Sequence, residues 1–180
     1  MTFNRWIPTF LAFPIGGYVA IETVGSSDGP LPAALGGLIV GAAIGVAQWL
    51  ALRSGGTSRR WIGRTTAGVA AGAALAAVVT GSGTEVPELV LSGLVTGAVA
   101  GAAQGSLLGR GPRAAAAWAA VTSASWALAW LITSQVIVDA ERGFHMFGSS
   151  GAIAATVITG LALRALTAGG APAPARPAAA

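Results

Sequence analysis

The sequence predicts an all-helical integral membrane protein with six transmembrane helices. Of its 180 residues, 54% are hydrophobic and only 9% are charged, and the mean hydropathy is +0.72. A soluble domain carries about 25% charged residues, so this chain lacks the polar surface that would keep it in water. Its many glycines do not indicate disorder, because disordered chains have low hydrophobicity.

Six apolar stretches are long enough to cross a hydrocarbon core, which takes roughly 17–25 helical residues. They are 6–24, 33–52, 61–80, 89–108, 114–138 and 147–166. The first is expected to be retained rather than cleaved as a signal peptide, because Pro8 and Pro14 interrupt it and no A-x-A site follows. The prediction is one transmembrane domain over 1–167 and a disordered Ala/Pro-rich cytoplasmic tail over 168–180.

The charged residues predict the orientation of these helices. All ten basic residues are arginines, and nine lie at the two termini or in the second–third and fourth–fifth connections. All six acidic residues lie in the other three connections, where Arg142 is the only arginine. By the positive-inside rule, both termini and the arginine-rich connections are cytoplasmic. Since the arginines mark helix ends, the positive charge does not indicate a nucleic-acid partner.

A motif of spaced glycines followed by glutamine occurs twice, at an offset of 56 residues: Gly37, Gly41, Gly45 and Gln48 recur as Gly93, Gly97, Gly101 and Gln104. Tryptophans that follow arginines also recur, and a third, weaker copy ends at Arg164. The chain is therefore predicted to hold three helical hairpins, at about 5–53, 60–110 and 113–164. Hairpins in series enter the membrane in the same direction, so they form parallel repeats about an axis along the membrane normal.

The glycine rows predict close helix packing of the glycine-zipper kind. Helices in lipid associate through van der Waals contact and interhelical hydrogen bonds, which small residues favour. Gly105 extends the second row, and each glutamine lies about 20° around the helix from a glycine of its row. Gln48 and Gln104 therefore either fix a helix contact by hydrogen bonding or line a polar path in mid-membrane.

A candidate outer site follows the fifth stretch. It comprises Trp126, Trp130, Asp139, Glu141 and Arg142, and Asp28 and Glu85 occupy similar places in the other outer loops. One interpretation is ordinary: interfacial tryptophans and solvated charges that make weak surface ion pairs. The other is a ring of acids around an external mouth that attracts cations.

This region resembles a family of uncharacterised six-helix membrane proteins from actinobacteria. The resemblance rests on W-A-L-x-W at 126–130, D-x-E-R at 139–142 and F-G-x-x-G-A at 147–152, together with G-S-G-T at 81–84 and the two glycine–glutamine segments. It extends over most of 33–166. It implies a bacterial cytoplasmic membrane and brings no known activity.

The sequence gives little indication of an enzyme. It has no cysteine, one histidine, no metal-binding spacing and no nucleophile elbow, so no cofactor or metal is predicted. The leading hypothesis is a non-catalytic scaffold or accessory subunit in the lipid bilayer, whose glycine faces pack against a second copy or a larger membrane complex. The alternatives are a small transporter or channel for a cation or small solute and, third, a lipid-modifying enzyme at the outer interface.

Overall fold

The computed structural model describes residues 3–136 and 142–168. These residues form six helical spans long and apolar enough to cross a membrane, and they include no strand. The spans are α1 (Phe3–Trp6), η1 (Ile7–Leu11) and α2 (Ala12–Val24) together, then α3 (Pro30–Leu52), α4 (Arg60–Thr80), α5 (Val86–Gly105), α6 (Gly111–Ser134) and α7 (Ser149–Ala168). The short η2 (Arg53–Gly55) follows α3. For the described residues, the prediction of an all-helical protein with six helices long and apolar enough to span a membrane is confirmed.

Prolines and caps set several helix ends that hydropathy placed elsewhere. Helices α3, α5 and α6 each begin three residues before the predicted start, with a proline in the first two positions, where no backbone N–H is needed. At α5 the side chains of Glu85 and Glu88 form a capping box, which makes Glu88 part of the helix. Helix α6 ends at Ser134, before the predicted 138, and the last two residues of that prediction lie outside the described residues.

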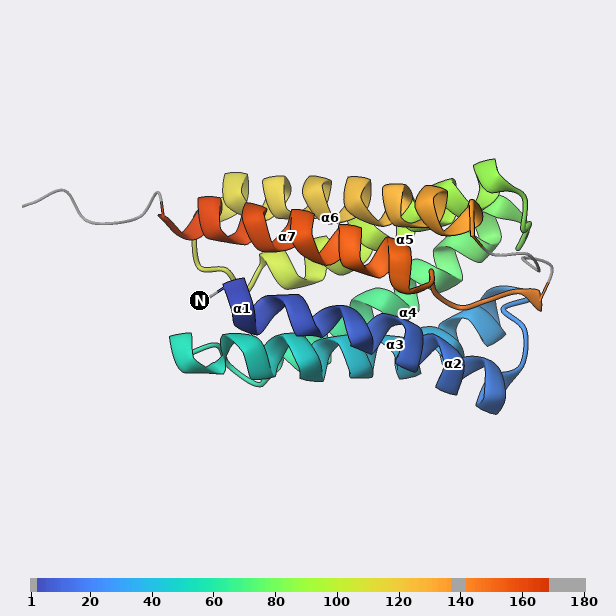
Figure 1. Ribbon diagram of the computed structural model, residues 1–180, viewed down its shortest axis with the longest axis horizontal. Helices are drawn as coiled ribbons and strands as arrows, with labels where there is room; N and C mark the ends of the chain where they lie inside the picture. Colours follow the sequence, from blue (N-terminus) through green and yellow to red (C-terminus); the bar gives the residue numbers. More distant parts are fainter. Residues whose placement is uncertain (1–2, 137–141, 169–180) are drawn as a thin grey trace, which may run out of the picture.

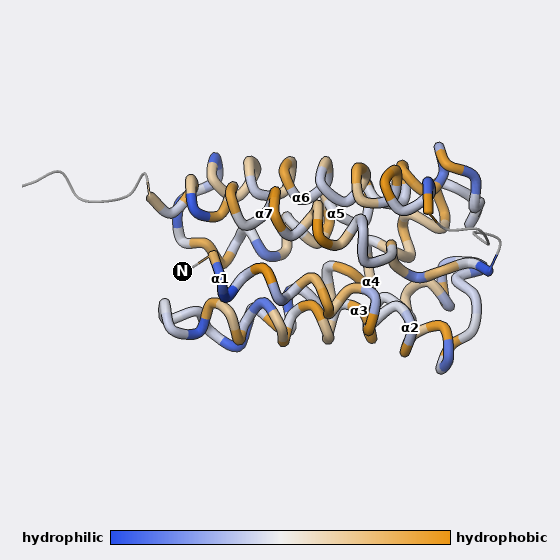
Figure 2. The backbone as a smooth tube through the Cα atoms, in the orientation of Figure 1, coloured by the Kyte–Doolittle hydropathy of each residue, from blue (hydrophilic) through white to orange (hydrophobic). Residues whose placement is uncertain are grey.

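The six spans form a closed ring. Spans that follow one another in the chain pack together, and α7 closes the ring by packing against α1, η1 and α2. Figure 1 shows the helices side by side along the long axis, with the start of α1 and the end of α7 at the same end. The α3–α4 and α5–α6 connections lie at that end too, and Figure 2 shows hydrophilic segments gathered mostly toward the two ends.

Glycines face the neighbouring helix at the ring's contacts. An added Cβ at Gly37, Gly41 or Gly45 of α3 would lie 2.8 to 3.0 Å from backbone atoms of α4. An added Cβ at Gly93, Gly97, Gly101 or Gly105 of α5 would lie 2.6 to 2.9 Å from backbone atoms of α6. Real Cβ atoms do not approach so closely, so these backbones meet only because the side chains are absent. The glycine rows thus contact helices of the same chain.

Large apolar side chains cover the outside of the ring. Leu31, Val78 and Leu161 are each more than half exposed, and they come from three different spans. An apolar surface over the whole perimeter would be unfavourable in water, but lipid tails are as apolar as leucine. The surface therefore fits a lipid bilayer.

We expect Gly97→Ala and Gly63→Ala to have opposite effects on stability. A Cβ at Gly97 would lie 2.8 Å from the Thr122 carbonyl oxygen, so the substitution should destabilise the protein by about 1–3 kcal/mol through overpacking. A Cβ at Gly63 meets nothing within 4 Å, so alanine there should stabilise helix α4 by up to about 1 kcal/mol. Unfolding in detergent measures both, and equal effects would contradict the described α5–α6 contact.

Candidate functional site

The two glutamines of the repeated motif meet inside the ring. Gln104 Nε2 on α5 donates a hydrogen bond to Gln48 Oε1 on α3 and another to Thr65 Oγ1 on α4, each 2.9 Å long. Gln48 is 6% exposed and Gln104 is 3% exposed. Each glutamine lies three residues after a close-contact glycine of its row, Gly45 or Gly101, so the glycine contacts lie beside these bonds.

Two tryptophan indoles complete this cluster. Trp61 Nε1 on α4 donates to Gln48 Oε1 at 3.1 Å, and Trp118 Nε1 on α6 donates to Gln104 Oε1 at 3.0 Å. Both tryptophans are almost fully buried, and their ring centroids lie 6.4 Å apart. We call Gln48, Trp61, Thr65, Gln104 and Trp118 the Trp–Gln layer. It joins α3, α4, α5 and α6 through side-chain hydrogen bonds.

A third buried tryptophan lies where the ring closes. Trp6 Nε1 donates to the Thr156 carbonyl oxygen of α7 at 2.9 Å, and a Cβ at Gly160 would lie 2.6 Å from the Trp6 ring. Trp6 belongs to the same apolar cluster as Trp61 and Trp118. The first and last spans are therefore joined beside the Trp–Gln layer by the same kind of donor, an indole N–H.

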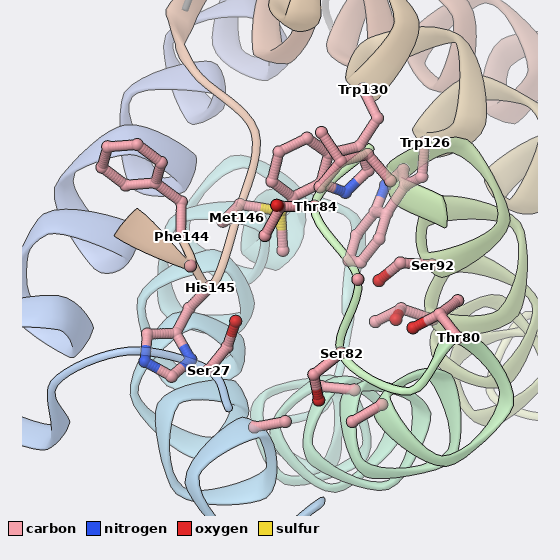
Figure 3. Close-up of a pocket in the computed structure, with 17 residues that line it drawn as sticks. Ser27, Thr80, Ser82, Thr84, Ser92, Trp126, Trp130, Phe144, His145 and Met146 are labelled. Carbon is pink, nitrogen blue, oxygen red and sulfur yellow. The ribbon is translucent and has the colours of Figure 1, made fainter. Parts of the chain in front are cut away.

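A hollow opens inside the ring near the connections that precede α3, α5 and α7, at the end predicted to face outside (Figure 3). We call it the outer hollow. Its volume is about 50 Å³, and residues of α3, α4, α5, α6 and the loops that precede α3, α5 and α7 line it. Trp126 and Trp130 form part of its wall, and both are buried. Edge-to-face contacts between each of these indoles and the fully buried Phe147 ring hold them in place.

A second hollow of about 420 Å³, which we call the inner hollow, lies at the opposite end, among the arginine-rich connections. Residues near the ends of α3, α5 and α7 line it, and so does Trp61 of the Trp–Gln layer. Arg110 also lines it and donates a hydrogen bond from Nη2 to the Thr167 carbonyl oxygen, 3.0 Å away.

The structure does not bring the other described members of the candidate outer site to the outer hollow. Asp28 Oδ2 accepts a hydrogen bond from Ser26 Oγ at 2.7 Å, and Glu85 caps α5. The Arg142 guanidinium lies over the Phe144 ring, 5.7 Å from its centroid. None of these three residues lines the hollow. Asp139 and Glu141 lie outside the described residues, so the ring of acids stays a prediction.

Sequence reasoning missed the position of His145. It lies in the loop before α7, lines the outer hollow and contacts the Gly25 carbonyl oxygen through Nε2 at 2.8 Å. Burial lowers the pKa of its imidazole below 6.5, and the hydrogen bond to Gly25 opposes this shift. The ring occupies the space that a Cβ at Gly36 would need. The sequence offered one signal of this contact, because Gly36 is a second glycine beside Gly37 and lies outside the row that faces α4.

Comparisons of this chain with protein families, with curated proteins and with solved structures find no match. The resemblance to an actinobacterial family of membrane proteins therefore stays a prediction.

We expect Trp118→Phe to cost more stability than Trp49→Phe. Phenylalanine keeps an aromatic ring and removes the indole donor, so Trp118→Phe leaves the buried Gln104 Oε1 without its Trp118 bond and should cost about 1–3 kcal/mol. Trp49 donates to the Thr57 carbonyl oxygen in a partly buried setting, where water can replace the donor. Thermal unfolding in detergent compares the two variants, and equal losses would contradict the role given to the buried bond.

Proposed function

We propose that this protein is a membrane conduit for a small uncharged solute, and that the described conformation is closed. The observation that carries the proposal is the pair of hollows at opposite ends of one helical ring. Packed side chains separate the two hollows. A ring that served solely as a rigid support would need neither hollow.

The helices α4 and α5 define the thickness of this barrier. On α4, Trp61 lines the inner hollow and Ala73 lines the outer one, twelve residues or about 18 Å further along the helix. Thr65 and Val69 lie between them, and both are at most 1% exposed. Thr96 of α5 lines the outer hollow, and Leu107, two residues after the end of α5, lines the inner one. The barrier therefore consists of the Trp–Gln layer and about two turns of α4 that include Val69.

The absence of charge in the barrier favours an uncharged solute. The buried polar residues among those that the structure describes are threonine, serine and glutamine only. Ion and proton pathways through membranes usually carry ionisable side chains, because a bare ion crossing hydrocarbon is costly. Hydroxyl and amide groups can form hydrogen bonds with an uncharged solute.

The same proposal includes three parallel hairpin repeats in a bacterial cytoplasmic membrane, with both termini cytoplasmic. Trp6, Trp61 and Trp118 support the repeat, since each donates its indole hydrogen to the span that precedes its own around the ring. The arginine-rich connections, the start of α1 and the end of α7 lie at one end of the ring, which supports the orientation. The glycine rows support packing of the glycine-zipper kind within the chain.

A scaffold remains the second candidate. The hydrogen bonds of the Trp–Gln layer favour it, because a bonded core needs no movement to be stable. A partner would have to bind the leucine- and valine-rich outer surface, since the predicted glycine faces contact neighbouring helices of the same chain. That requirement makes the scaffold the weaker proposal.

Solute flux into proteoliposomes tests the conduit. We expect the wild-type chain to raise the permeability to acetamide above that of empty liposomes. Val69→Ala should raise this permeability further, by several-fold, because the smaller side chain opens space in the apolar part of the barrier.

Val78→Ala is the matched control, since Val78 lies on the same helix and is 66% exposed on the outside of the ring. It should behave as the wild type does. Equal permeability of empty liposomes, wild type and Val69→Ala would reject the conduit and favour the scaffold.

A further inference from the structure

Two of the six tryptophans differ from the others in their hydrogen bonding. Trp6, Trp49, Trp61 and Trp118 each donate an indole hydrogen bond to the protein. Trp126 is 4% exposed and Trp130 is 5% exposed, and neither indole N–H forms a hydrogen bond with another described residue. Among the described residues, the side-chain polar atoms that are both fully buried and unpaired are the hydroxyls of Thr9, Thr133 and Thr156, and the two indole N–H groups are not among them.

These two donors share the outer hollow with further unpaired groups. The hydroxyls of Thr84, Ser92 and Thr96 line the same hollow, and they too form no hydrogen bond with a described residue. Thr96 is 6% exposed, so it is as buried as the two indoles. In Figure 3, Trp126, Ser92 and Trp130 lie along one side of the opening, below the α6 ribbon. The hollow is thus lined by indole and hydroxyl groups that form no hydrogen bond with another described residue, while the polar groups of the Trp–Gln layer are bonded to one another.

The hollow limits the size and charge of what can bind there. A water needs roughly 10–15 Å³, so a hollow of about 50 Å³ holds about three to five waters or a molecule of that size. The described residues that line it include no Asp, Glu, Lys or Arg. Burial also lowers the pKa of His145, which disfavours the charged form of its imidazole.

We propose that the outer hollow is a binding site for a small uncharged carbonyl or amide solute, whose oxygen accepts hydrogen bonds from Trp126 and Trp130. The hydroxyls of Thr84, Ser92 and Thr96 bond to the remaining polar atoms of the solute. Indole N–H groups can only donate, so they select an acceptor and reject a molecule that carries donors alone. This inference rests on the proposed conduit and adds the class of solute that it admits.

The indole N–H resonances of the full chain in detergent micelles test the site directly. The chain is labelled with ¹⁵N-tryptophan, and Trp126→Phe and Trp130→Phe assign the two signals. We expect acetamide to shift the Trp126 and Trp130 signals in a saturable manner and to leave those of Trp61 and Trp118 in place. Ethylammonium, which is similar in size but has no acceptor, should leave all the signals in place. Thr96→Val should raise the dissociation constant for acetamide about fivefold.

The outcomes separate the site from the conduit. Parallel, unsaturable shifts of all the indole signals, or none at all, would overturn the binding site, even if acetamide flux were observed. Saturable shifts confined to Trp126 and Trp130, without flux, would support the site and reject the conduit.

Discussion

A buried amide inside a lipid-embedded bundle must find its hydrogen-bond partners within the protein, because the surrounding hydrocarbon offers none. Gln48 and Gln104 meet this constraint together. Gln104 donates to α3 and α4 and accepts from α6, and Gln48 accepts from α4 and α5. Four of the six spans are therefore held in register by one cluster, whose bonds require the helices to lie at fixed distances from one another.

The glycines make those distances possible. Since lipid tails compete with apolar side chains for contact, a membrane bundle gains most where backbones approach closely. The approach of α3 to α4, and of α5 to α6, brings the glutamines within reach of the two indoles. The packing and the polar layer thus depend on each other. The layer borders the inner hollow through Trp61, and the outer hollow lies beyond it along α4, so a bonded barrier separates two hollows, which is the basis for the proposed conduit.

Most of the fold could be predicted from local patterns in the sequence. Hydropathy found all six spans, and the spacing of glycines placed Gln48 and Gln104 on the side that faces another helix. Hydropathy could not find the helix starts at Pro30, Val86 and Gly111, because prolines and caps extend helices into polar segments. Of the residues that line the outer hollow, the sequence analysis had singled out Trp126 and Trp130. His145 and Thr96 were missed, since their positions depend on contacts between residues far apart in the chain.

The most direct test of the central claim is a double-mutant cycle on the two glutamines, with unfolding measured in a lipid bilayer. Gln48→Leu and Gln104→Leu should each destabilise the protein by roughly 0.6–2 kcal/mol, since each leaves an indole donor without its acceptor. The double variant should lose at least about 0.5 kcal/mol less than the sum of the single losses, as for residues in one network. Losses that simply add would mean that the two glutamines do not interact, which would contradict the Trp–Gln layer as the element that holds the ring together.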